Sequence, residues 1–325
     1  MTDLVPPPDR LELIPVAGIG EVTEGTDLAG LVARAGVADG DVALLTSKVV
    51  SKAEGRVTTG DRATAVAAET VRVVARRGST AIVENHLGLV MAAAGVDASN
   101  VAPGRVVLLP LDPDATARSV REEVLRRTGH NVAVVVTDTA GRAWRNGQTD
   151  IAIGVAGLEP VASLAGRHDR FGNPLAVTAP AVADELAGAA ELVAGKLGGR
   201  PLVLVRGLAG LVQPAGQHGP GARALVRERG EDMFGLGARE AVLAAVRRSD
   251  AASFGAPAPR TELLAALASC GWSAVADGDD VRVDAGDDET GATTRLVEAV
   301  AFAHGWRPSP DHEPAEGLRL ERGIQ

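Results

Sequence analysis

Apolar residues in this chain fall into short unbroken runs separated by stretches with helical spacing. Runs dominated by Val and Leu, such as 132–136 and 201–205, predict strands that are buried on both faces. Stretches whose apolar residues recur every three or four positions, such as 115–127 and 182–196, predict helices. The same criteria predict further strands at 11–16, 42–46, 80–83, 106–111 and 151–155, and further helices at 26–35, 61–77, 222–229 and 236–248. The pattern indicates an α/β fold of the mixed α+β kind, with a core of mixed sheets and surrounding helices.

The last quarter of the chain differs from the rest in charge. The whole sequence has 33 Lys and Arg against 42 Asp and Glu, a net charge of −9. Residues 250–325 hold 14 of the acids and 6 of the bases, so −8 of this charge lies there. The change follows the Ala- and Pro-rich stretch 251–259 and predicts a core domain at 1–249 and a small acidic module at 250–325. The pattern of this module predicts the order α-β-β-α, with helices at 261–269 and 293–304 and strands at 272–276 and 281–284.

Polar side chains follow the most apolar predicted strand. Thr137, Asp138 and Thr139 come directly after the Val run, and Arg142 and Arg145 stand a few residues further on. Ligands of open α/β sheets bind beyond the carboxyl ends of the strands, so we expect these side chains to line a binding crevice. The acid and the hydroxyls can hold a hard divalent cation, and the arginines can bind phosphate or carboxylate. We take Asp138, Arg142 and Arg145 as candidate catalytic residues; in the alternative, Asp138 and Thr139 cap a following helix and the arginines are solvated.

Other places in the chain have the residue types of a phosphate or cation site. The stretch 46–55 has two serines and two lysines directly after a predicted strand, where they can bind phosphate or lie solvated at the surface. Asp97 and Asn100 can face a cation or a nucleotide, and an Asx turn explains them equally well. Gly18 and Gly20 form only half of a dinucleotide fingerprint, and the sequence has no Walker A motif. A bound nucleotide would therefore be held without a P-loop.

Composition argues against several classes of protein. Hydrophobic residues make up 46% and charged residues 23%, as in ordinary soluble proteins, and no apolar run is long enough to span a membrane. The N-terminus does not have the pattern of a secretory signal, so we expect a cytoplasmic protein. Cys270 is the only cysteine, which excludes internal disulfides and a thiolate metal cluster. The negative net charge and the 2% of aromatic residues argue against nucleic acid as a partner.

Seven stretches between residues 11 and 249 are informative when they are taken together. They are LIPVAG (13–18), TSKVVSKAEGR (46–56), AAAGVDASNV (92–101), LLPLDPD (108–114), VVVTDTAGRAWRNGQTDIAIG (134–154), VADE (182–185) and VRG (205–207). In this order they resemble the coenzyme F420-0:γ-glutamyl ligase family. One such stretch is a weak signal, whereas seven in order are specific.

The resemblance implies a GTP-dependent ligase that joins L-glutamate to the lactyl carboxylate of a deazaflavin coenzyme. It further implies Mg²⁺ or Mn²⁺, with K⁺ as a further candidate ion, and a homodimer. The implied metal ligands are Asp97, Asp138 and Thr139. The implied GTP contacts are Ile19, Gly20, Glu21, Val22, Ser47, Lys52, Asn100 and part of the loop 207–222, beginning at Gly207. The chain departs from the family pattern in two places: 250–325 is too short for the nitroreductase-like domain of bifunctional members, and the loop looks longer than usual at 213–218.

The implied reaction agrees with the absence of a nucleophile motif. A carboxylate does not acylate an amine until a phosphoryl group has been transferred to it, and that transfer needs positioning and charge neutralisation more than covalent work by the protein. The sequence has no Ser/His/Asp or Cys/His signature. Two other interpretations stay open. One is a non-catalytic nucleotide-binding or regulatory protein that uses the same groups; the other is a nicotinamide-dependent oxidoreductase, which the incomplete glycine fingerprint disfavours.

Overall fold

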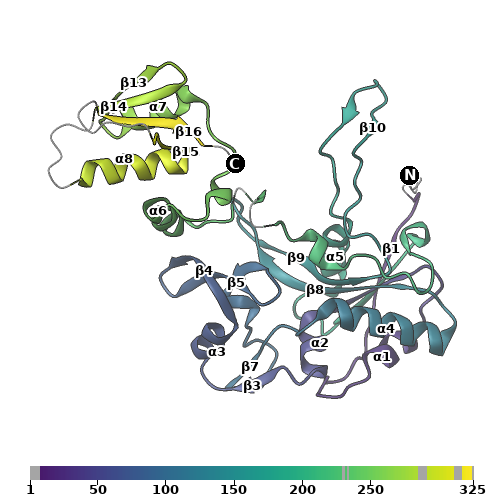
Figure 1. Cartoon of the computed structure of the whole chain (residues 1–325). Coiled ribbons are helices and arrows are strands. Elements are labelled where there is room, and N and C mark those ends of the chain that lie inside the picture. Colours follow the sequence, from purple (N-terminus) through teal and green to yellow (C-terminus); the bar gives the residue numbers. More distant parts are fainter. Residues whose placement is uncertain (1–7, 229–230, 233, 285–290, 311–316, 324–325) are drawn as a thin grey trace. The chain divides into compact units, whose positions relative to one another are not determined.

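The computed structural model describes residues 8–228, 231–232, 234–284, 291–310 and 317–323 (Figure 1). The chain divides into two compact units, one made of 1–73 and 78–226, the other of 74–77 and 227–325. The break between these units falls at 226/227, ahead of the sequence-based boundary at 249/250, which stays a prediction about the functional domain. None of the helices within the described ranges is long and apolar enough to cross a membrane.

A five-stranded sheet forms the centre of the first unit. Its inner strands β2 and β8 run parallel, and every other neighbouring pair is antiparallel, so the sheet is mixed, as predicted. The Val run of β8 is completely buried, as its composition indicates. In spatial order the strands are β1 (Glu12–Pro15), β12 (Leu202–Arg206), β2 (Val42–Thr46), β8 (Ala133–Gly141) and β9 (Gln148–Ala156).

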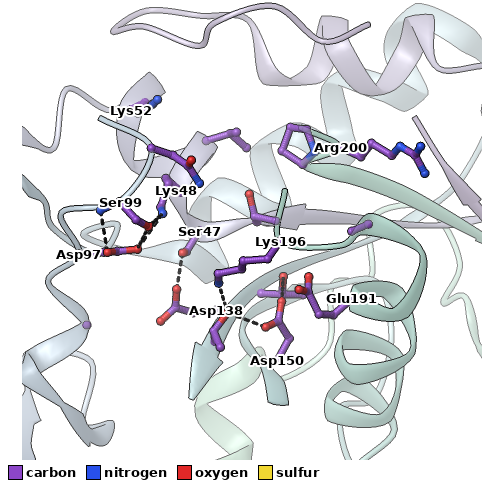
Figure 2. Close-up of a pocket in the computed structure, with 18 of the residues that line it drawn as sticks. Ser47, Lys48, Lys52, Asp97, Ser99, Asp138, Asp150, Glu191, Lys196 and Arg200 are labelled. Carbon is purple, nitrogen blue, oxygen red and sulfur yellow. Dashed lines mark hydrogen bonds and ion pairs between the residues drawn. The ribbon is translucent and has the colours of Figure 1, made fainter. Parts of the chain in front are cut away.

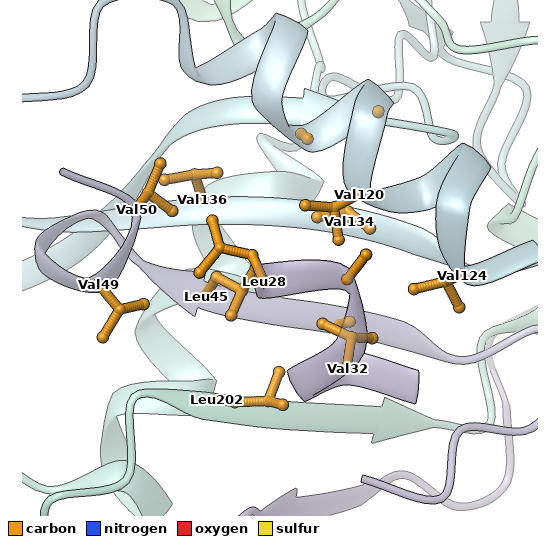
Figure 3. Close-up of a cluster of buried hydrophobic side chains, with 14 of the residues drawn as sticks. Leu28, Val32, Leu45, Val49, Val50, Val120, Val124, Val134, Val136 and Leu202 are labelled. Atoms are coloured by element: carbon orange, nitrogen blue, oxygen red, sulfur yellow. The ribbon is translucent and has the colours of Figure 1, made fainter. Parts of the chain in front are cut away.

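Helices cover both faces of this sheet. Alternate side chains of a strand point to opposite faces, and along β8 Val134 and Val136 join one buried cluster while Val135 joins another. Figure 3 shows the first cluster, in which Leu28 and Val120 pack over the sheet. The helices on this face are α1 (Leu28–Arg34), α2 (Ser47–Ala53) and α4 (Pro113–Thr128), and α5 (Val182–Ala194) covers the other. The unit is therefore a three-layer arrangement that holds the strand ends rigidly.

Short strands and one short helix complete the first unit, apart from residues 74–77 at the end of β4, which belong to the second. The predicted helix 61–77 is wrong in its second half, because α3 (Arg62–Glu69) ends where the alternating, β-branched sequence TVRVVARR begins β4. The predicted helix 222–229 is only a 3₁₀ turn at Ala222–Leu225. The remaining strands are β3 (Val57–Thr59) with β7 (Arg105–Val107), β4 (Thr70–Arg77) with β5 (Thr80–Asn85) and β6 (Val90–Ala92), and β10 (Arg167–His168) with β11 (Pro174–Leu175).

The second unit contains the predicted α-β-β-α order and extends it by two strands. Its sheet is antiparallel in the order β13-β14-β16-β15 and buries Leu263, Val281 and Trp306 in a core of its own. The sequence analysis predicted neither of the last two strands, β15 and β16. The elements are α6 (Ala238–Arg247), α7 (Arg260–Ser269), β13 (Ser273–Asp277), β14 (Asp280–Asp284), α8 (Ala292–Ala303), β15 (Trp306–Pro308) and β16 (Leu318–Arg322).

Candidate functional site

The site is built where the parallel strands β2 and β8 end side by side. Thr46 and Thr137 are the last paired residues of these strands, after which β2 turns directly into α2. A register shift between Val136 and Thr137 lets β8 continue to Gly141 against β9. Asp138 and Thr139 therefore lie within a strand, and the alternative that they cap a following helix is wrong. Because β8 extends beyond the end of β2, its polar side chains face the first turn of α2.

A cavity of about 720 Å³ lies at these strand ends, a volume typical of a small-molecule site. All of its lining residues belong to the first unit. The principal walls are formed by 19–22 after β1, by β2 and α2 at 46–52, by the turn at 91–100, by β8 and β9, and by the end of α5 with the turn that follows at 191–201. Figure 2 shows charged side chains from α2, the turn, β8, β9 and the end of α5 around this cavity, among them Lys48, Asp97, Asp138 and Lys196.

Two lysines of α2 form one cationic wall. Lys48 and Lys52 stand four residues apart and so share a helix face. The ammonium of Lys48 lies 2.7 Å from the Asp97 carboxylate, and that of Lys52 lies 2.5 Å from Glu21. Burial opposes ionisation of Asp97, but hydrogen bonds from Lys48 and Ser99 outweigh it and lower the pKa of Asp97 to about 2. Asp97 is thus a carboxylate at neutral pH, neutralised by a lysine.

Carboxylates form the floor of the cavity. The Ser47 hydroxyl donates to Asp138 at 2.6 Å, and the Thr139 hydroxyl donates to Asp150 at 2.7 Å. Burial raises the pKa of Asp138 to about 6, against the Ser47 hydrogen bond and with a further increase from Asp150. Burial, followed by the charge of Asp150, also raises the pKa of Glu191. The carboxylates of this floor repel one another, so a bound cation would stabilise their ionised forms.

The turn after α5 brings a third lysine over this floor. Gly195 has φ +65°, a backbone conformation that favours glycine, and it turns the chain back over the last turn of the helix. The Lys196 ammonium then donates to the Thr139 hydroxyl at 2.8 Å. In Figure 2 Lys196 lies beside Asp138, Asp150 and Glu191.

Oxygen ligands for a divalent cation are available at the floor and first wall. Mg²⁺ usually takes only one or two carboxylates and completes its coordination with waters and substrate phosphates. The carboxylates of Asp97 and Asp138 and the Thr139 hydroxyl are hard ligands of this kind, and all three residues line the cavity. Across the described ranges no three His, Cys, Asp or Glu side chains converge into a metal cage. The donor set therefore fits a cation shared with a phosphate, and not one enclosed by protein alone.

Most of the residues predicted from sequence meet in this cavity. They are Ile19, Gly20, Glu21, Val22, Ser47, Lys52, Asp97, Asn100, Asp138 and Thr139. Arg142 and Arg145 do not line it; both are exposed in the turn between β8 and β9, where Arg142 donates to the Asn146 carbonyl at 2.6 Å. The prediction that they line the crevice assumes that β8 ends at Val136, whereas β8 continues to Gly141.

Gly207 also lies away from the cavity. It follows β12, which is antiparallel to β2, so that it lies at the opposite end of the sheet beside the backbone of Arg10. The loop after it is held at that same end by the buried Arg121, which donates to the carbonyls of Gln213 and Pro214 at 2.6 and 3.2 Å. A GTP contact by Gly207 or this loop stays a prediction that the cavity does not include.

The sequence analysis left Lys196 and Glu191 out of the site, although one signal for Lys196 was available. Of the 33 basic residues only three are lysine, and the other 30 are arginine. The three lysines are Lys48, Lys52 and Lys196, and all line this cavity. A chain that uses arginine for every other positive charge keeps lysine where a compact ammonium with three donors is needed.

A rigid α/β scaffold with opposed cationic and acidic groups at its strand ends defines an enzyme site for small charged substrates. Comparison of the sequence with known proteins identifies the family within this class of enzyme. The family model for F420-0:gamma-glutamyl ligase matches residues 18–207. The chain belongs to the F420-0:gamma-glutamyl ligase family.

Relatives from several organisms match over most of their own length. A coenzyme F420:L-glutamate ligase of Archaeoglobus fulgidus is 40% identical over 220 residues, which cover 61% of this chain and 88% of the relative. Proteins with the same description from Methanopyrus kandleri and Methanothermobacter thermautotrophicus are 38% and 34% identical over 69% of this chain and 97% and 98% of theirs.

Proposed function

We propose that this chain joins L-glutamate to coenzyme F420-0 by an amide bond, in the biosynthesis of coenzyme F420, at the expense of GTP and with a divalent cation. The observation that carries the proposal is the meeting of Lys48, Lys52, Asp97 and Asp138 in one cavity at the ends of β2 and β8. Family membership supports the ligase reaction, and the charges of the cavity support the nucleotide and the cation.

The first step is transfer of the γ-phosphoryl group to the coenzyme carboxylate, which gives an acyl phosphate and GDP. The amine of glutamate then attacks the acyl carbon and phosphate leaves, so that one amide is formed for each GTP consumed. Both steps gather negative charge on phosphate oxygens. Lys48 and Lys52 line the cavity from one helix face and can neutralise this charge. A divalent cation held by Asp97, Asp138 and Thr139 would neutralise phosphate oxygens and fix their orientation.

Nucleotide binding would rearrange the ion pairs of the first wall. Lys48 and Lys52 form ion pairs with Asp97 and Glu21. A cation on Asp97 would release Lys48 for phosphate, and Glu21 is largely exposed and can leave Lys52 at little cost.

A homodimer belongs to the same proposal. The hairpin of β10 and β11 projects away from the sheet in Figure 1. In this segment Phe171 is 75% exposed and Val177 is 92% exposed, which is a costly arrangement for large apolar side chains unless another chain covers them. Light scattering of the purified chain tests this part, since a monomer at micromolar concentration would contradict it.

Mass spectrometry of a complete reaction tests the activity. The purified chain is incubated with GTP, Mn²⁺, coenzyme F420-0 and L-glutamate, and the expected product is the coenzyme with one or more glutamyl residues, together with GDP and phosphate. Omitting any one component should abolish the product. Tight GTP binding without any product would favour the non-catalytic nucleotide-binding protein and overturn the proposal.

A further inference from the structure

The turn between β8 and β9, residues 142–147, exposes a tryptophan. Trp144 is 68% exposed, although the chain has only three tryptophans, four phenylalanines and no tyrosine. Of the other two tryptophans, Trp306 is buried and Trp272 packs against the core of the second unit. Trp144 is therefore a large apolar ring that the core of the protein does not use.

The backbone of Trp144 is strained as well. Its φ is +60°, in the left-handed region that glycine and asparagine adopt more easily than a bulky residue. Gly147, three residues further on, has φ +85° at no such cost. Strain of this kind collects at ligand sites, so a bulky aromatic residue at a position that disfavours it points to a role for its ring.

This turn begins where the lining of the cavity ends. Gly141 and Gln148 are the last pair of β8 and β9, and both line the cavity. Asp138, on the cavity floor, lies three residues before Gly141, which is roughly 10 Å along a strand. Residues 141–148 contain two arginines and no acid, so this part of the rim has a charge of +2 in a chain of net charge −9. The rim therefore attracts anions.

The cavity alone is small for the substrates of the proposed reaction. Its volume of about 720 Å³ suits one drug-sized ligand, whereas GTP and the acceptor coenzyme are two. Among the described residues that line it, none is aromatic. The acceptor has a planar deazaflavin ring, joined through a polyol chain to a phosphate and the reacting lactyl carboxylate. When the carboxylate lies at the floor, the polyol chain carries the ring toward the rim.

We infer that the β8–β9 turn is the subsite for the acceptor coenzyme, in which Trp144 stacks on the deazaflavin ring and Arg142 and Arg145 bind its phosphate. The inference rests on the proposed function. Arg142 donates to the Asn146 carbonyl at 2.6 Å, which shapes the turn, and its guanidinium keeps further donors for a ligand. Arginine suits this position because its planar fork binds phosphate bidentately.

Replacing Trp144 by Asn tests the ring contact without disturbing the turn. Asn adopts the left-handed conformation more easily than Trp, so the unfolding midpoint of Trp144→Asn should be equal or higher. The KM for coenzyme F420-0 should rise roughly tenfold, because stacking on an aromatic side chain is lost, and the KM for GTP and L-glutamate should stay within about twofold. Trp144→Phe has the same backbone strain and an aromatic face, and should retain most of the affinity. Arg118→Met, an exposed change on α4, is the control.

Two fragments of the coenzyme separate its ring from its acidic end. The deazaflavin with its polyol chain, without phosphate and lactate, should inhibit the wild-type enzyme and inhibit Trp144→Asn much less. Phosphorylated lactate, which lacks the ring, should inhibit both proteins equally and should inhibit Arg145→Met less. Tryptophan fluorescence, measured without glutamate, reports binding independently of turnover, and the coenzyme should quench it in the wild type more than in Trp144→Asn.

Several results would overturn the inference. An unchanged KM for the coenzyme in Trp144→Asn would remove the ring contact. A rise in the KM for GTP alone would assign the turn to the guanine base. A changed oligomeric state in light scattering, with an unchanged KM for the coenzyme, would make the turn an interface between copies of the chain. A wild-type chain that binds the coenzyme through Trp144 but forms no amide would contradict the proposed function instead, which keeps the two failures distinct.

Discussion

The two ends of the central sheet use buried charge in opposite ways. At the cavity end, where β2 and β8 finish, the buried Lys52 is paired with the exposed carboxylate of Glu21, and burial raises the pKa of Asp138. At the far end Arg121, 2% exposed, is surrounded by carbonyl acceptors of the loop and of Val132, and burial lowers its pKa.

The comparison shows how a buried cation can be assigned to structure or to function. The guanidinium of Arg121 is fully used by internal acceptors, so it fixes the loop and offers nothing to a ligand. The cavity end keeps surplus acids and movable lysines, which costs stability that ligands can restore. Variants at the two ends should therefore separate activity from stability.

Asp138→Asn should lower the activity more than any other variant. It should also make the fold more stable at pH 8 in the absence of metal. We expect turnover to fall roughly 10²- to 10³-fold, because a metal ligand and its charge are lost. Coupled turnover assays across a Mn²⁺ titration measure this. An active variant with unchanged metal dependence would remove Asp138 from the metal site.

The stability of the same variant depends on pH in a defined direction. The folded pKa of about 6 lies above the model value of 3.8, so the folded state binds the proton more tightly. Wild-type stability is therefore highest below about pH 4 for this group and falls as the pH rises through 6, by an amount on the order of 2–3 kcal/mol. Asn does not titrate, so in the absence of metal the variant should be the more stable protein at pH 8. Denaturant unfolding at pH 4 and pH 8 checks the crossover.

Arg121→Met should have the converse effect. It leaves several buried carbonyls without a donor, which should cost about 3 kcal/mol or more in unfolding free energy. The folded variant should keep its KM values, because Arg121 does not line the cavity. Arg118→Met, on the same helix and exposed, should change stability by only about 0.5 kcal/mol. Equal unfolding midpoints for the two variants would show that the buried network is unimportant.

The sequence predicts some features of the two ends of the sheet and misses others. The Val run of β8 and the polar residues after it gave the central strand and Asp138, because burial and chain order are both visible in sequence. The extent of β8 was not visible, since the register shift at Val136/Thr137 lets TDTAG stay in the sheet, and this misplaced Arg142 and Arg145.

The partners of the charged side chains could not be predicted from the sequence either. Arg121 lies on a helix with many charged residues, and its burial depends on a loop that begins almost 90 residues later. Lys196 came at the end of an apolar helix and gave no local motif. Only the scarcity of lysine in the whole chain marks it. Local periodicity cannot reveal either pairing, because both form through tertiary contacts.

Lys52→Met tests the α2 wall with a moderate expected effect. Lys52 is buried, and Met fills a similar volume. Loss of the ammonium should weaken the binding of GTP by roughly 2 kcal/mol or more. Glu21, which loses its partner, is exposed enough to be solvated, so the unfolding free energy should change little. Calorimetry with GTP and Mn²⁺ measures the affinity. An unchanged value would take Lys52 out of the nucleotide site.

Removal of residues 250–325 should have the smallest effect on activity. The truncation tests whether the reaction at the cavity end of the sheet needs this segment. This segment carries −8 of the net charge, a field that repels GTP and the phosphate-bearing coenzyme. A chain that stops after Ser249 should therefore turn over within about twofold of the full chain, with a KM for GTP that is equal or lower, and lower mainly at low salt.

The design of this truncation needs one control, because the second compact unit begins at 227. Arg248 pairs with Glu298 at 3.1 Å in the full chain, so α6 loses a partner when the module is removed. Circular dichroism and thermal unfolding must show that the shortened chain is folded before its kinetics are compared. A folded but inactive truncation would mean that the acidic module contributes groups to the reaction, and the assignment of activity to the cavity of the first unit would then be incomplete.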